Sequence, residues 1–116
     1  MKEHIYIMTE DQGVWTAPKN GKINVYVDQF LSRSTDNTIV HCCIDECKRI
    51  TQCNNHLVPA IFTFLCGKKA NIFKYFSTPE SVTIDVDNCL HFYFTDENNR
   101  RISENTPIVR YKMIYQ

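Results

Sequence analysis

Glycine is scarce in this sequence, with 3 residues in 116, and no internal repeat or low-complexity segment occurs. So few glycines leave little room for a flexible linker, and a chain of this length is too short for two separate stable cores. Hydrophobic residues make up 43% of the chain, which is enough for one core and argues against disorder. We therefore expect a single domain spanning residues 1–116.

An excess of charge of either sign is also absent, because 13 lysines and arginines balance 13 aspartates and glutamates. Nucleic-acid-binding domains usually carry a basic excess, so nucleic acid is not an expected partner. The longest apolar stretch, residues 57–66, contains a proline. It is much shorter than the ~20 residues of a membrane-spanning helix, so we expect no membrane span.

Signals of secretion are missing as well. The first residues are polar and form no apolar leader, and no Asn-x-Ser/Thr glycosylation acceptor is present. These features favour an intracellular location, where cytosolic buffers keep cysteines reduced.

Common catalytic and nucleotide-binding motifs do not occur: G-x-G-x-x-G, the P-loop, H-E-x-x-H and G-x-S-x-G are all absent. Cys66 beside Lys68 and Lys69 could act as a thiol nucleophile, although a cysteine that ends a buried strand looks the same in sequence. We expect no enzymatic activity and no cofactor, apart from the zinc hypothesis given below. Acidic residues that could hold calcium are equally typical of turns; they are Asp85, Asp87, Asp96 and Glu97.

Alternation of apolar and polar residues is the dominant pattern, and it is typical of half-buried β-strands. The clearest segments are residues 22–28, 81–86, 90–95 and 108–115. We predict an all-β fold, a single antiparallel β-sandwich or barrel of about eight strands. Jelly-roll-like and immunoglobulin-like sandwiches both fit, because periodicity does not reveal the order of connections.

Asn20-Gly21 is the strongest turn signal, since both central positions of a type I′ turn need a positive φ. It predicts a hairpin between residues 14–19 and 22–28, with Trp15 opposite Tyr26. Residues 57–66 are apolar on both faces, which predicts a central strand.

Residues 45–56 break the alternation, and cysteines gather near them. Asp45 could cap a helix, so we expect one short helix near residues 45–53. Buried free thiols, a disulfide and a zinc site are all open interpretations of the cysteines. The chain has Cys42, Cys43, Cys47, Cys53, Cys66 and Cys89, and the candidate zinc ligands are Cys43, Cys47, Cys53 and His56.

The C-terminal part of the chain carries a resemblance to a known group of proteins. Residues 81–86 (SVTIDV), 90–96 (LHFYFTD), 101–102 (RI) and 109–115 (VRYKMIY) resemble the closing strands of viral β-sandwich proteins. These are small capsid, spike or attachment proteins of eukaryotic DNA viruses and virus-derived transposons. The many Asn, Ile, Lys and Tyr residues are also common in their AT-rich genomes. The resemblance implies a role in virion structure or attachment through oligomer contacts, with no catalytic residues, and the virion as a second location.

We therefore expect a non-enzymatic structural, assembly or attachment module that acts through protein–protein contacts. Self-association as a dimer or trimer is expected where a strand edge or an aromatic face stays uncovered. Candidate contact residues are Tyr93, Arg110, Tyr111, Lys112 and Tyr115. Two alternatives stay open: a zinc- or thiol-dependent regulatory protein built on residues 42–56, and a carbohydrate-binding sandwich that uses Trp15 and the tyrosines.

Overall fold

The structure is a computed structural model that describes residues 2–32, 38–47, 51–53, 56–58, 60–66, 72–75 and 81–116. For residues 38, 51–53, 56–58, 60–61, 64–66 and 72–75 it describes the backbone alone. All elements in these ranges are β-strands. These ranges contain no helix that could span a membrane.

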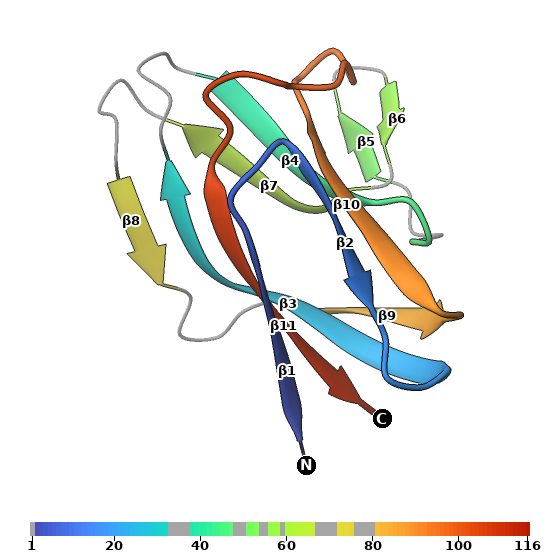
Figure 1. Ribbon diagram of the computed structural model, residues 1–116. Helices are drawn as coiled ribbons and strands as arrows, with labels where there is room; N and C mark the ends of the chain where they lie inside the picture. The colour runs from blue at the N-terminus through green and yellow to red at the C-terminus, as the bar shows by residue number, and fades with distance from the viewer. Residues whose placement is uncertain are drawn as a thin grey trace.

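Two antiparallel sheets pack face to face as a β-sandwich (Figure 1). Sheet A consists of β1 (Glu3–Met8), β3 (Gly21–Ser32), β8 (Ile72–Tyr75), β9 (Ser81–Val86) and β11 (Ile108–Tyr115), in the order β1-β11-β3-β8 with β9 also on β3. Sheet B consists of β2 (Gln12–Thr16), β4 (Thr38–Ile44), β7 (Ala60–Cys66) and β10 (Cys89–Thr95), in the order β2-β10-β4-β7. A two-stranded hairpin of β5 (Thr51–Cys53) and β6 (His56–Val58) connects β4 to β7.

The order of connections identifies this sandwich as a jelly roll. β8 and β9 pair with residues 29–32 and 21–26 of β3, so together they fill one position in sheet A. Within the described residues, eight positions result, in the order 1-8-3-6 in sheet A and 2-7-4-5 in sheet B. Every connection between consecutive positions crosses to the other sheet, except that from β4 to β7. This is the double Greek key of a jelly roll, and the sheets form an open sandwich, not a barrel.

The core lies between the inner faces of the two sheets, and the predicted alternation is confirmed there. On β3 and β9 the buried side chains are Ile23, Val25, Val27, Val82, Ile84 and Val86. β10 contributes Leu90, Phe92 and Phe94, and β11 contributes Val109, Tyr111 and Met113. Large apolar side chains from both sheets therefore share one core.

The predicted hairpin at Asn20-Gly21 is wrong. β2 and β3 belong to different sheets, and Trp15 lies opposite Leu90 of β10, not opposite Tyr26. Gly21 has a positive φ of 144°, which lets the chain leave sheet B for sheet A. Asn20 accepts a hydrogen bond from the backbone N–H of Asn88 at 3.1 Å, so it bonds to the neighbouring β9–β10 connection. Asn20 does not share this positive φ, so the turn is not the predicted type I′, and it joins two sheets.

The predicted short helix near residues 45–53 is also wrong where these residues are described. The backbone N–H of Asp45 donates to the carbonyl of His91 at 3.0 Å, so Asp45 extends the sheet and does not cap a helix. A turn follows, and Thr51–Cys53 is strand β5. Residues 48–50 lie outside the described residues.

The prediction of a central strand at residues 57–66 fails too, because β7 is the last strand of sheet B and pairs with β4 alone in the described part of the chain. An apolar run indicates which faces of a strand are buried, and it does not indicate whether both edges of the strand are paired. The side chain of Cys66, the candidate nucleophile, lies outside the described residues, as do Lys68 and Lys69.

Candidate functional site

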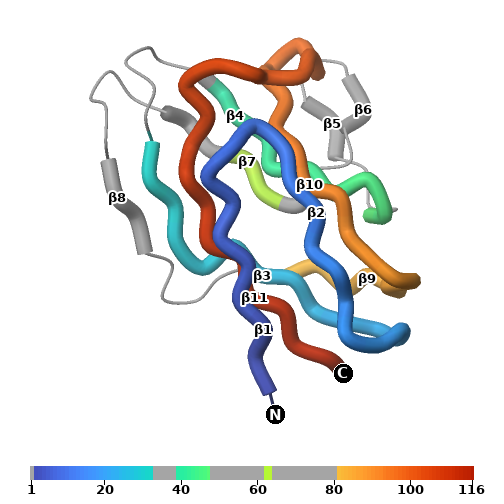
Figure 2. Tube along the Cα trace, viewed as in Figure 1, coloured from blue at the N-terminus to red at the C-terminus, as the bar shows by residue number. Residues whose placement is uncertain are grey.

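The large apolar side chains that are exposed in the described residues all lie on two strands. They are Ile5 (39% exposed) and Ile7 (55%) on β1, and Val14 (52%) on β2. β1 and β2 are edge strands of sheet A and sheet B, and a short turn joins them at one side of the sandwich (Figure 2). Single exposed apolar residues are normal on a protein surface. Their restriction to two adjoining edge strands makes this side the candidate contact surface.

β1 pairs with β11 and, within the described residues, with no strand on its other side. Such an edge presents unpaired backbone N–H and C=O groups, which proteins commonly protect with lysine, proline or a bulge. The middle of β1 carries Ile5 and Ile7 instead. We call this strand with its two outward isoleucines the β1 edge.

The inner face of β1 holds the strand against the core. The ring of Tyr6 lies 5.1 Å from that of Phe92 and stacks on Tyr111 at 6.4 Å. Gly13 of β2 leaves room for the Tyr6 hydroxyl, because a Cβ at this position would collide with it. Burial raises the pKa of Tyr6, and the charge of Glu10 adds to the rise. The β1 edge is therefore fixed in place before any partner arrives, which lowers the entropy lost on binding.

The outer face of sheet A beside the β1 edge carries positive charge. Ile5 lies opposite Lys112, and Ile7 lies opposite Arg110, in the β1–β11 register. Arg110 Nη1 lies 3.5 Å from Asp28 Oδ2, and this ion pair partly neutralises it. Arg110 and Lys112, two of the predicted contact residues, thus lie next to the β1 edge.

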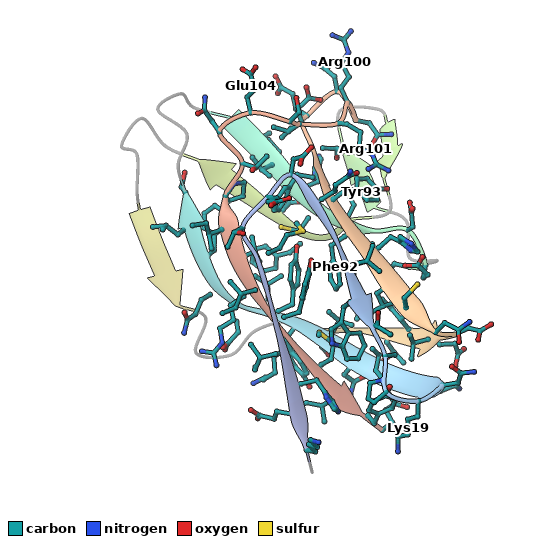
Figure 3. All side chains as sticks on the ribbon, in the orientation of Figure 1. Lys19, Phe92, Tyr93, Arg100, Arg101 and Glu104 are labelled. Atoms are coloured by element: carbon teal, nitrogen blue, oxygen red, sulfur yellow. The ribbon has the colours of Figure 1, made fainter. Side chains whose placement is uncertain are left out.

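The three predicted contact tyrosines are not on this face. Tyr111 is 0% exposed, and burial raises its pKa well above the ordinary value. Tyr115 is half-buried and donates its hydroxyl to the carbonyl of Lys19 at 2.5 Å. Tyr93 lies on the outer face of sheet B, where the Arg101 guanidinium sits 3.7 Å from its ring centroid (Figure 3). The predicted contact residues therefore do not form one surface.

The cysteines of the predicted zinc set are buried where their side chains are described. Cys43 is 0% exposed, and its thiol lies 3.7 Å from the carbonyl oxygen of His41. Burial raises the pKa of Cys43 to about 11, so the thiol stays protonated at neutral pH, whereas zinc binds the thiolate. Cys47 is 6% exposed. The backbones of Cys53 and His56 pair in the β5–β6 hairpin, and their side chains lie outside the described residues.

The acidic residues considered for calcium stabilise turns. Asp87 Oδ1 accepts a hydrogen bond from Asn20 Nδ2 at 3.1 Å. Asp96 Oδ1 accepts from the backbone N–H groups of Asn98 and Arg100, both at 2.9 Å. Within the described residues these carboxylates do not come together as a group of metal ligands.

Trp15, the residue considered for carbohydrate binding, packs against the core. Its ring lies 5.8 Å from that of His4, which also meets Tyr115 edge-on at 5.7 Å. A groove of about 460 Å³ lies beside these rings, with Lys2 and Lys19 in its lining. Trp15 thus takes part in core packing, and Tyr115 and His4 line the groove.

Two features were missed in the sequence. The first is the β1 edge. Residues 5–8 read Ile-Tyr-Ile-Met, which is apolar on both faces, and this pattern is the sequence feature that could have indicated the edge. The second is a group of three ligating side chains, Asp45, Glu46 and His91. Pairing of β4 with β10 brings them together, and no local motif marks them.

Comparisons of the chain with protein-family models, with curated proteins and with solved structures gave no match. The proposed function therefore rests on the fold and its surfaces.

Proposed function

We propose that this domain is a non-enzymatic assembly module that associates with a second copy of itself through antiparallel pairing of two β1 strands. One observation carries the proposal: the exposed large apolar side chains of the described residues all lie on edge strands β1 and β2. Strand addition at an open edge gains affinity from backbone hydrogen bonds and specificity from alternate side chains.

The alternation of β1 restricts the register of such a pair. A two-fold axis perpendicular to sheet A keeps each face continuous, so opposed residues must both point outward or both point inward. Centring the axis on Tyr6 places Ile5 of each copy opposite Ile7 of the other copy, so all four isoleucines form one apolar cluster. Centring it on Ile5 or on Ile7 would instead place the other isoleucine opposite Glu3 or Thr9.

Charge supports the same register. With the axis at Tyr6, Lys2 of one copy lies opposite Glu10 of the other copy, and this happens twice by symmetry. Opposite charges across paired strands are stabilising, and like charges in the same positions would oppose pairing. One strand pair buries a small area, so we expect a dissociation constant of about 1–100 µM.

The jelly-roll order agrees with this proposal by analogy, since jelly rolls are common in capsid and lectin domains. The resemblance of residues 81–115 to small capsid and attachment proteins points the same way. A structural or attachment subunit, including one of a virion, needs a repeated contact between identical chains, and the β1 edge could supply it.

Sedimentation equilibrium over a wide concentration range tests the proposal. We expect the mass to rise from one chain to two as concentration increases. Ile7→Lys should give a monomer throughout, because it puts a charge on the edge. Val14→Lys is the matched control, since Val14 is similarly exposed (52% against 55%) on the other edge strand, and it should still dimerise. A monomeric wild-type chain, a trimer, or a dimer unaffected by Ile7→Lys would contradict the proposal.

A further inference from the structure

Three side chains with metal-binding atoms meet on sheet B, away from the β1 edge. Asp45 and Glu46 follow the end of β4, and His91 lies on β10. Their ligating atoms, two carboxylate oxygens and an imidazole nitrogen, all lie within 4.8 Å of one another. The residues are exposed or half-buried, so a solvated ion can reach them.

The strand pairing determines the positions of these three residues. Ile44 lies opposite Phe92, and one residue later the N–H of Asp45 donates to the carbonyl of His91 at 3.0 Å. The carboxylate of Glu46 then accepts two hydrogen bonds from His91, from its backbone N–H at 2.6 Å and from its ring Nδ1 at 2.8 Å. Both acidic residues are thus held beside the same imidazole by the sheet itself.

We propose that Asp45, Glu46 and the Nδ1 atom of His91 form a binding site for a divalent transition-metal ion such as Zn²⁺. The ion would take the place of the proton that Nδ1 shares with Glu46. In a tetrahedral zinc site, bonds of about 2.0–2.2 Å put neighbouring ligand atoms roughly 3.4 Å apart, so the 2.8 Å contact must open by about half an ångström. A rotation of two partly exposed side chains provides that movement.

The other ring nitrogen of His91, Nε2, has a neighbouring side chain that can orient the ring while Nδ1 binds the ion. Nε2 lies 4.0 Å from Sγ of Cys89, two residues earlier on β10. A histidine that binds metal through one nitrogen carries its proton on the other, and a second group that accepts a hydrogen bond from this N–H orients the ring. Cys89 therefore acts as a positioning residue, and the ligands to the ion are nitrogen and oxygen.

The site also opens onto a surface groove. Asp45 and His91 line a groove of about 450 Å³ together with Val14, Tyr93 and Arg101. Three protein ligands leave at least one coordination position for water or another ligand, and the groove gives access to it. The inference is independent of the proposed dimer, because its residues belong to sheet B.

Calorimetric titration of the reduced, full-length chain with Zn²⁺ tests the site. We expect about one ion per chain, and His91→Gln and Glu46→Gln should each weaken binding about 100-fold. Glu104→Gln removes an exposed carboxylate on the β10–β11 connection and should leave binding unchanged. Far-UV circular dichroism of each variant checks that the sheets are intact. Absence of Zn²⁺ binding, or binding that survives His91→Gln, would overturn the proposal.

Titration with Co²⁺ separates this site from the cysteine set predicted from the sequence. Nitrogen and oxygen ligands give no thiolate-to-cobalt charge-transfer absorption, so we expect none of that absorption, and Cys53→Ser should bind like wild type. A strong charge-transfer band that disappears in Cys53→Ser or in Cys89→Ser would show that cysteine binds the ion, and the proposed ligand set would be wrong.

Discussion

The ring centroid of Phe92 lies 4.4 Å from that of Tyr111, with the two ring planes tilted by 39°. Phe92 belongs to β10 in sheet B and Tyr111 belongs to β11 in sheet A, so this pair joins the two sheets in the core. Tyr6 of β1 packs on both rings. The position of the β1 edge thus depends on an aromatic cluster that both sheets share.

Replacing Phe92 should strongly destabilise the domain. Phe92→Ala leaves a cavity between the sheets and removes two ring contacts, and we expect the free energy of unfolding to fall by about 3–5 kcal/mol. Urea unfolding followed by far-UV circular dichroism measures this change. Glu104→Ala, an exposed loop substitution, should stay within about 0.5 kcal/mol of wild type. A loss below about 1 kcal/mol for Phe92→Ala would mean that the two sheets do not depend on this ring.

Disulfide cross-linking should report the register of the proposed dimer. With the axis at Tyr6, residue 5 of one copy faces residue 7 of the other, and neither position faces itself. An equimolar mixture of Ile5→Cys and Ile7→Cys should therefore form a mixed disulfide-linked dimer faster than either variant alone. Mass spectrometry of peptides containing residues 5 and 7 identifies the bond among those of the native cysteines. Faster cross-linking of either single variant would place the axis elsewhere.

Cys43 should make the domain sensitive to alkali. Burial raises its pKa from 9.0 to about 11, so between these values the unfolded chain loses the thiol proton while the folded chain keeps it. The stability that Cys43 contributes is therefore present below pH 9 and is lost as the pH rises towards 11, an effect on the order of 2 kcal/mol. Unfolding free energies of Cys43→Ala at pH 7 and at about pH 10.5 should differ less than those of wild type.

Cys89→Ala is the control for this measurement, because it also removes a cysteine, but one that is only partly buried. The pKa values of Tyr93 and Tyr111 are also raised by burial, so some alkaline loss should persist in every variant. The difference between Cys43→Ala and wild type in the pH dependence of the unfolding free energy is therefore what tests the prediction. Equal slopes for Cys43→Ala and wild type would show that this thiol titrates as it does in the unfolded chain.

Gly13 and Tyr6 should be energetically coupled. A Cβ at position 13 would collide with the Tyr6 hydroxyl, so Gly13→Ala must displace the ring and should destabilise the domain by about 1–3 kcal/mol. Tyr6→Phe removes the colliding oxygen, and the double variant should recover part of that loss. A double-mutant cycle from urea unfolding measures the coupling. Additive effects of the two substitutions would contradict the close contact.

Sequence periodicity predicted the inner faces of the strands well and their partners poorly. Val82, Ile84 and Val86 alternate with polar residues because one face of β9 meets the core and the other meets solvent, and this local rule is visible in any strand. The neighbours of a strand depend on residues far away in the chain. Trp15 pairs with Leu90, which lies 75 positions later, and no local pattern encodes that choice.

The β1 edge and the group of Asp45, Glu46 and His91 could not be predicted from the sequence for the same reason. Ile5 and Ile7 alternate with Tyr6 and Met8 as in any strand, and nothing in the sequence says that β1 ends a sheet. His91 meets Asp45 and Glu46 only because β4 pairs with β10. Tyr111 was expected to make partner contacts, but it follows the inward alternation of Val109 and Met113 and fills the core.

The pairing of β1 with β11 has a consequence for how the domain is made. β1 finds its partner in β11, about a hundred residues later, so sheet A is incomplete until residues 108–115 leave the ribosome. Six of the seven connections between consecutive positions of the jelly roll, as the described strands define them, also cross to the opposite sheet, which makes the mean separation of contacting residues large. Chains with such topology fold in about milliseconds to seconds. During that time both sides of β1 are open, and crowded nascent chains could meet through β1 before β11 arrives.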